Sequence, residues 1–212
     1  LASWSSYSIR KLENIFHHCL TESPPIIEIP EIESEESYLL IDGLWHGKKY
    51  CQMLYRHHNR KLLIHASFVS RERGSLIAKD LKYLKSKYRF TGIVSDGATG
   101  IGNAILNVFG NIPHQICMAH LHRDIINAIG RFPKDQRVKE LKKLADHIWL
   151  IESKEALRWW QKWLQSWEDK NRDFLDERRH IEGIGWWFVH TGVRKANMIL
   201  VSLPDTSFKF LD

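Results

Sequence analysis

The chain has 212 residues, 43% hydrophobic and 26% charged, which is ordinary for a globular protein with a sizeable core. Its 31 Lys and Arg against 25 Asp and Glu give a formal charge of +6, compatible with a polyanionic partner without requiring one. The apolar runs are too short for a membrane span and the three cysteines too scattered for a disulfide framework. We therefore expect no membrane partner and a reducing compartment.

The first predicted element is a short amphipathic helix over residues 8–20, where apolar residues recur at helical spacing. It is either a plain surface helix or the last helix of a helix-turn-helix unit, in which case Arg10 and Lys11 would face DNA. Residues 21–37 contain three prolines, six glutamates and no Lys or Arg, a composition typical of an extended linker.

Three apolar or alternating runs follow and predict an antiparallel meander: YLLIDGLW, KKYCQMLYRHH and RKLLIHASFVS. Residues 74–88 predict a helix that sets lysines opposite one apolar face, formed by Leu76, Ile77, Leu81 and Leu84. A strand over 90–97 that ends in an acid, a helix over 98–110 and a fifth strand over 114–117 complete a β-β-β-α-β-α-β order. The order predicts an α/β fold.

The hydrophobic period is helical almost throughout from His120 to about Leu200, which predicts an all-helical block. One apolar stripe consists of Leu141, Leu144, Ile148 and Ile151, and a second of Ala156, Trp160, Trp163 and Trp167. Tryptophans at helical spacing favour packing between helices over stacking on nucleic-acid bases.

Two acids end apolar strands: Asp42 follows YLLI and Asp96 follows GIVS. If the first and fourth strands are neighbours, the two carboxylates lie side by side, and a divalent cation such as Mg²⁺ would relieve their repulsion. Each acid alone is more typical of a turn, because Asp-Gly pairs are frequent turn formers. The order of the elements favours a metal site with Asp42 and Asp96 as ligands.

Three motifs, LLIDGLW, VSDGATGIGNAI and ICMAHLHRDI, resemble in sequence and order the DDE transposases of bacterial insertion sequences and eukaryotic Mutator-like elements. The resemblance runs from about residue 38 to the end of the chain. It implies a ribonuclease H-like mixed sheet with a helical insertion, and makes Asp42 and Asp96 the first two catalytic carboxylates, which bind Mg²⁺ or Mn²⁺. It also aligns Cys117 and His120 with the family's C-x-x-H motif, for which we expect a role in supporting the active site.

Spacing alone leaves other interpretations of that motif open. From the spacing alone, a core cysteine and a capping histidine are the favoured interpretation of Cys117 and His120. A structural zinc site needs about four protein ligands. His114 and His122 are near in sequence but do not complete a convincing set.

The chain departs from the family at the third acid, a glutamate that the resemblance places in a Thr-Asn-x-x-Glu stretch after the helical block. Glu182, in HIEGIGWW, has neither the flanks nor the position for that role. SLPDTSFKFLD resembles the lead-in to the missing stretch, and the chain opens without Met. We therefore expect a fragment of a longer protein that stops shortly before its third catalytic residue.

These observations divide the chain into five parts. They are a remnant of an N-terminal DNA-binding helix (1–20), an acidic linker (21–37), a ribonuclease H-like core (38–120), a helical insertion (121–201) and a lead-in to the missing catalytic segment (202–212).

The resemblance implies metal-dependent DNA strand cleavage and strand transfer, with element terminal repeats and target DNA as partners of a homo-oligomer on paired ends. It places the protein in the cytoplasm, on the nucleoid, if the element is bacterial, and in the nucleus if it is eukaryotic. One basic face is a candidate for contact with the DNA phosphates, and it consists of Arg71, Arg73, Lys79, Lys82, Lys85 and Lys87. The solvent-exposed side of an ordinary amphipathic helix has the same pattern. Two alternatives use the same fold: a nuclease without strand transfer, and a domesticated transposase that binds DNA without catalysis.

Overall fold

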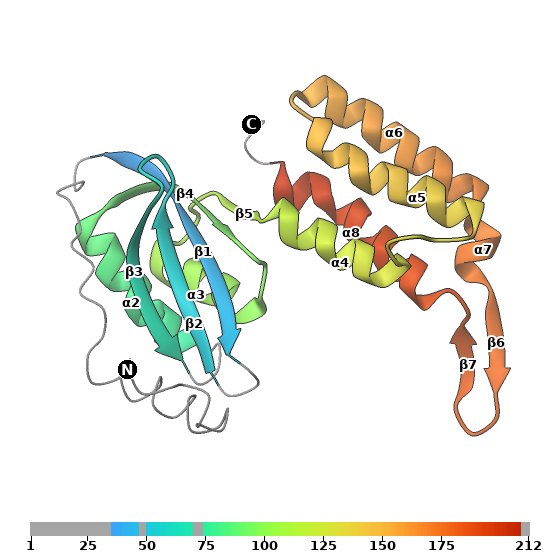
Figure 1. Ribbon diagram of the computed structural model, residues 1–212, viewed down its shortest axis with the longest axis horizontal. Coiled ribbons are helices and arrows are strands. Elements are labelled where there is room, and N and C mark those ends of the chain that lie inside the picture. Colours follow the sequence, from blue (N-terminus) through green and yellow to red (C-terminus); the bar gives the residue numbers. More distant parts are fainter. Residues whose placement is uncertain (1–34, 47–49, 70–73, 209–212) are drawn as a thin grey trace, which may run out of the picture.

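Figure 1 shows two lobes, a sheet with two helices and a group of helices, joined where the last strand of the sheet leads into a helix. The computed structural model describes residues 35–46, 50–69 and 74–208. Several sequence predictions lie outside these residues, namely the helix over 8–20, most of the linker over 21–37, Arg10, Lys11, Arg71 and Arg73.

The first lobe is built on a five-stranded mixed sheet with strand order β3-β2-β1-β4-β5. Its strands are β1 (Glu36–His46), β2 (Tyr50–His57), β3 (Leu62–Val69), β4 (Arg89–Ser95) and β5 (His114–Ile116). The first three strands pair antiparallel, whereas β4 pairs parallel with β1 on one side and with β5 on the other. This is the strand order of a ribonuclease H-like fold, so the predicted fold class is confirmed.

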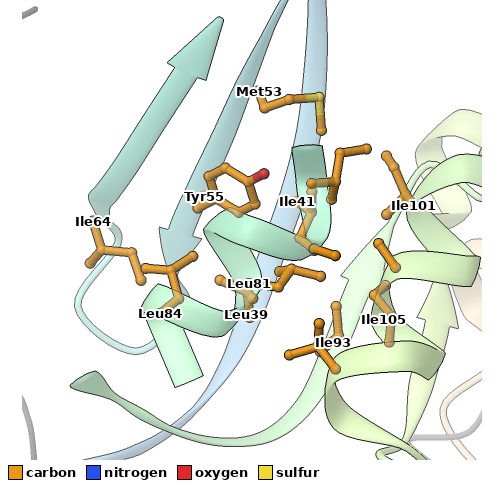
Figure 2. Close-up of a cluster of buried hydrophobic side chains, with 14 of the residues drawn as sticks. Leu39, Ile41, Met53, Tyr55, Ile64, Leu81, Leu84, Ile93, Ile101 and Ile105 are labelled. Carbon is orange, nitrogen blue, oxygen red and sulfur yellow. The ribbon is translucent and has the colours of Figure 1, made fainter. Parts of the chain in front are cut away.

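One face of the sheet carries the core of this lobe. Alternate residues of the strands are buried, as a period of two requires, among them Leu39 and Ile41 on β1 and Met53 and Tyr55 on β2. Helices α2 (Gly74–Lys87) and α3 (Thr99–Phe109) cover this face, and Figure 2 shows their side chains meeting those of the strands.

The predicted apolar face of α2 is right except at Leu76, which is 41% exposed. The buried residues of α2 are Ile77, Ala78, Leu81 and Leu84. Successive residues of an α-helix lie about 100° apart, so Leu76 falls outside the stripe centred between Ile77 and Leu81.

A polar cluster ties α2 to the sheet. The carboxylate of Asp80 on α2 accepts hydrogen bonds from the hydroxyls of Tyr55 at 2.9 Å and Ser67 at 2.5 Å, and His65 Nε2 lies 3.4 Å from its other oxygen. Burial raises the pKa of Asp80, but the hydrogen bonds from His65, Ser67 and Tyr55 outweigh it and hold the pKa below the ordinary value. Burial and the neighbouring Asp80 raise the pKa of Tyr55, which keeps the phenol protonated as a donor.

The second lobe surrounds its own hydrophobic core. Its helices are α4 (Met118–Ile129), α5 (Gln136–His147), the 3₁₀ turn η2 (Ile148–Leu150), α6 (Lys154–Lys170), α7 (Arg172–Asp176) and α8 (Thr191–Ser207). The whole predicted stripe of α5 and η2 is buried, namely Leu141, Leu144, Ile148 and Ile151.

Three of the four tryptophans of α6 pack in this core, as their spacing predicts, whereas Trp159 is 67% exposed. Trp160 and Trp167 are buried, and Trp163 and Ala156 pack against them partly buried. The indole N–H of Trp160 donates to Leu144 O and that of Trp167 to Arg137 O, each at 3.0 Å, so neither buried donor is left unpaired.

The prediction that this block is all-helical is wrong, because it contains a β-hairpin of β6 (Arg178–Ile181) and β7 (Gly185–Phe188). Gly183 and Gly185 adopt φ of 77° and 94°, a backbone conformation that glycine tolerates and that interrupts a helix. Trp186 and Trp187 on β7 are exposed, in contrast to Trp160 and Trp167 of α6.

Helix α8 lies close against α4. The start of α8 lies beside the end of α4, and the two helices run antiparallel (Figure 1). A Cβ at Gly192, near the start of α8, would clash with Ala128 O near the end of α4, so this close approach requires glycine. No helix in the described ranges is both long and apolar enough to cross a membrane.

Gly192→Ala is expected to lower the free energy of unfolding by about 1–3 kcal/mol, because the added methyl group forces the backbones of α4 and α8 apart. Gly102→Ala in α3 is the matched control, since a Cβ there meets nothing within 4 Å. It should be neutral, or stabilising by up to about 1 kcal/mol through helix propensity. Urea unfolding of both variants checks this, and equal effects would contradict the close packing of α4 on α8.

Candidate active site

The parallel pairing of β1 with β4 brings two acids to one edge of the sheet. Leu39 pairs with Ile93 and Leu40 with Val94, so the same register continued for two residues sets Asp42 beside Asp96. Asp42 lies on β1 and Asp96 directly follows β4. The predicted pairing of the first strand with the fourth is therefore present.

Each of these carboxylates keeps one oxygen free of protein hydrogen bonds within the described ranges. Oδ1 of Asp42 accepts from Gly43 N, and Oδ1 of Asp96 accepts from Ala98 N, both at 2.9 Å. No described residue bonds Oδ2 of either acid, and the Asp42 side chain is 59% exposed. Two adjacent carboxylates with free, accessible oxygens are suitable ligands for Mg²⁺ or Mn²⁺, which bind oxygen and retain water or substrate ligands.

The C-x-x-H motif lies against both acids. Cys117 N donates to Ser95 O at 2.6 Å, next to Asp96, and Cys117 O accepts from His120 N at 3.1 Å in the first turn of α4. His120 Nε2 then lies 3.6 Å from Asp42 Oδ1. The motif thus connects the β5–α4 corner to the ends of β4 and β1, a contact that the sequence alone did not reveal.

The sequence also gave no sign that Ser95 and His114 position the end of β4. Ser95 is buried, its hydroxyl lies 2.9 Å from His114 Nε2, and it accepts a hydrogen bond from Gly97 N at 3.3 Å. Gly97 has φ of 83°, and a Cβ there would approach the side chain of Ile116 to 3.0 Å. The Ser-Asp-Gly order therefore serves the turn that carries Asp96.

The histidines near the C-x-x-H motif have other partners. His114 contacts Ser95, and His122 Nε2 lies 3.0 Å from Asp146 Oδ1. Within the part of the chain that the structure describes, no group of three or more His, Cys, Asp or Glu is arranged to hold a metal ion. The described residues therefore offer no four-ligand zinc site at Cys117 and His120.

The expected DNA-binding lysines lie on the outer face of α2. Lys79 and Lys82 are exposed, whereas Lys85 Nζ donates to Val108 O at 2.7 Å and lies 5.3 Å from the centroid of the Phe109 ring. Lys85 therefore helps to join α2 to α3, and the described part of this basic face is smaller than the sequence suggested.

Glu182 lies in the turn between β6 and β7, and Figure 1 places this hairpin at the far end of the helical lobe from the sheet. In contrast, the C-terminal end of α8 lies beside the corner where β5 leads into α4 (Figure 1).

The fold and the paired acids define a ribonuclease H-like domain with a carboxylate pair at the carboxyl ends of β1 and β4. The sequence matches the family "Transposase, Mutator family" over residues 67–180, which is more than half of the chain. The chain belongs to the Mutator family of transposases, which confirms the resemblance at the level of the family.

Among solved structures, the chain is similar to the catalytic core domain of BIV integrase, with 19% sequence identity. The match covers 70% of this chain and 90% of that one, with a TM-score of 0.31. This similarity is too low to define the fold, which is defined by the strand order itself. No curated protein matches the chain significantly.

Proposed function

We propose that the chain is the catalytic domain of a DDE transposase that cleaves DNA strands and joins them to a second duplex. The observation that carries the proposal is the parallel register of β1 and β4, which sets Asp42 beside Asp96 in a chain of the Mutator family. The free oxygen on each acid supports a role in binding a divalent cation.

Asp42 and Asp96 are the residues that would hold Mg²⁺ or Mn²⁺. When bound, the metal supplies Lewis-acid chemistry, which activates water or a 3′ hydroxyl as the nucleophile and stabilises the leaving oxygen. The protein would position the two carboxylates. The backbone N–H groups of Gly43 and Ala98 donate to Oδ1 of Asp42 and Asp96, respectively, which orients each carboxylate and leaves its Oδ2 available to a cation.

His120 would tune this site from the side of the helical lobe. Its Nε2, 3.6 Å from Asp42 Oδ1, places an imidazole nitrogen beside the first carboxylate. His114 would help to position Asp96, since its Nε2 lies 2.9 Å from the hydroxyl of Ser95, the last residue of β4.

We further propose that the third carboxylate comes from sequence after α8. In the described residues no third acid joins the Asp42 and Asp96 pair. The end of α8 lies beside the β5–α4 corner (Figure 1), and His120, in the first turn of α4, lies 3.6 Å from Asp42, which supports a third carboxylate from this side.

The partners that we propose are the terminal repeats of the element and the target DNA, bound by a homo-oligomer that holds paired ends. The net charge of +6 and the exposed lysines of α2 support a polyanionic partner. The location would follow that of the DNA, the nucleoid in a bacterium or the nucleus in a eukaryote.

The test is a strand-transfer assay with the full-length gene product, Mn²⁺ or Mg²⁺, and a labelled duplex that carries the element ends. Covalent joining of a labelled 3′ end to a second duplex is the expected result. Cleavage without joining would indicate a nuclease of the same fold and would overturn the transposase proposal.

A DNA-binding derivative without catalysis is a second candidate, favoured by the absence of a third acid beside the pair among the described residues. Its signature is DNA binding that persists in chelator, weakens steeply with salt and is accompanied by no cleavage in either metal.

His120→Ala should lower the free energy of unfolding by about 1–2 kcal/mol, because the imidazole holds the β5–α4 corner against Asp42. Cys117→Ser should change it by less than about 1 kcal/mol, because the bonds of Cys117 to Ser95 and His120 are backbone bonds and Ser is favoured at the N-cap of α4. The effect of His120→Ala on the free energy of Mn²⁺ binding should be smaller than its effect on stability. Thermal unfolding and Mn²⁺ titration of the two variants check this order, and loss of metal affinity with unchanged stability would favour a metal ligand instead.

A further inference from the structure

A basic pocket lies on the helical lobe, between α4 and α5, outside the carboxylate site. It is open and has a volume of about 570 Å³. The polar residues that line it include His122, Arg123 and Asn127 of α4, Arg131 just beyond that helix, and Lys142 of α5. None of its lining residues is acidic.

The two arginines of this pocket have no protein partner in the ranges that the structure describes. Arg123 and Arg131 are exposed, and no described residue forms a hydrogen bond or ion pair with either guanidinium group. Unpaired guanidinium groups at a concave surface are suited to phosphate, which they bind through two parallel hydrogen bonds.

The other two basic side chains are held in place by one acid. Asp146 lies 2.6 Å from Lys142 Nζ and 3.0 Å from His122 Nε2. Burial raises the pKa of Asp146, but these hydrogen bonds outweigh it and lower the pKa, so the carboxylate stays ionised. Arg123, Arg131 and Lys142 carry three positive charges against the one negative charge of Asp146, which leaves an excess of two positive charges among these four residues.

Helix α4 connects the carboxylate pair to the pocket, since its first turn contacts Asp42 and its later residues line the pocket. His120, Arg123 and Asn127 are spaced by three and four residues, so they lie on one face of the helix. His120 touches Asp42, and Asn127 lies about 10 Å further along the axis at 1.5 Å per residue. That distance corresponds to about three base-pair steps of DNA.

The C-terminal end of α4, capped at Gly130, adds partial negative charge to the pocket. Anion binding there therefore depends on the two arginines, which makes them the residues to substitute.

We propose that this pocket binds a backbone phosphate of the DNA that extends from the Asp42 and Asp96 pair. The inference rests on the proposed function, because it takes the carboxylate pair as the point at which the DNA is cleaved. It adds a second anchoring point on the helical lobe, a few nucleotides from the reacting phosphate.

The experiment measures binding of a fluorescein-labelled duplex to the chain in EDTA, over a series of salt concentrations. EDTA removes any contribution of metal at the carboxylate pair. Arg123→Gln and Arg131→Gln should each weaken binding and lower the slope of log Kd against log salt by about 1. Arg158→Gln, an exposed arginine on α6, is the matched control and should leave affinity and slope unchanged.

All three arginines are exposed, so the variants should share the melting temperature of the wild type, which circular dichroism checks. If Arg123→Gln and Arg131→Gln bind the duplex as Arg158→Gln does, the proposal is overturned. Protection of the wild type by inorganic phosphate in a thermal-shift assay, with duplex affinity unchanged in the variants, would identify a small-anion site and overturn it as well.

The experiment distinguishes failure of the pocket proposal from failure of the proposed function. Duplex binding by the wild type with no effect of the pocket variants rejects the pocket alone. Absence of any duplex binding by the wild type rejects the pocket together with DNA as the partner of this domain.

Discussion

Asp42→Asn or Asp96→Asn in the full-length gene product should lower the rate of metal-dependent strand cleavage by about three orders of magnitude or more. Asn keeps an Oδ1 that can accept from Gly43 N or Ala98 N, so the local fold should persist. It loses the negative charge that a divalent cation requires. Cleavage of a labelled duplex in Mn²⁺ measures the effect.

Asp173→Asn is the matched control, because Asp173 is exposed on α7 and has no hydrogen-bond or ion-pair partner among the described residues. It should cleave at the rate of the wild type. Cleavage at wild-type rate by either Asp42→Asn or Asp96→Asn would contradict the metal site.

Asp80→Ala should destabilise the first lobe by about 3 kcal/mol at neutral pH, since alanine has no oxygen to accept the hydrogen bonds that one carboxylate oxygen now accepts from Tyr55 and Ser67. Tyr55 is fully buried and its hydroxyl would be left without an acceptor. Tyr55→Phe, which removes the donor, should cost only about 1 kcal/mol. Urea unfolding measures both, and an Asp80→Ala variant no less stable than Tyr55→Phe would contradict this account of the cluster.

The same cluster predicts a pH dependence. The pKa of Asp80 is lowered from 3.8 in the folded state, so its contribution to stability is complete above 3.8 and is lost as the pH falls through the lower, folded value. The difference in unfolding free energy between the wild type and Asp80→Ala should therefore narrow as the pH falls below 3.8. A difference that stays constant would show that the pKa of Asp80 is the same in the folded and the unfolded protein.

The sequence predicted those parts of the site that depend on local pattern and strand order. Asp42 and Asp96 each end an apolar strand, and the order of elements placed these strands together, which the pairing of Leu40 with Val94 bears out. The stripe of Leu141, Leu144 and Ile148 was predicted equally well, because a helical period determines which residues share a face.

The rest depends on contacts between distant elements, which no local pattern encodes. His120 meets Asp42 only because α4 starts directly at the end of β5, and the pairing of Ser95 with His114 depends on the parallel register of β4 and β5. The β6–β7 hairpin was missed since its strands are only four residues long, too short to show a period of two within a helical block.

The proposed activity depends on the binding of a divalent cation by Asp42 and Asp96 together. The most direct measurement is a titration of Mn²⁺ into the 212-residue chain, followed by electron paramagnetic resonance, for the wild type, Asp42→Asn, Asp96→Asn and Asp173→Asn. We expect one bound Mn²⁺ in the wild type and in Asp173→Asn, and at least about tenfold weaker binding in either of the other two variants, as loss of a charged ligand implies. Equal Mn²⁺ affinity in all four proteins, or none in the wild type, would contradict the claim.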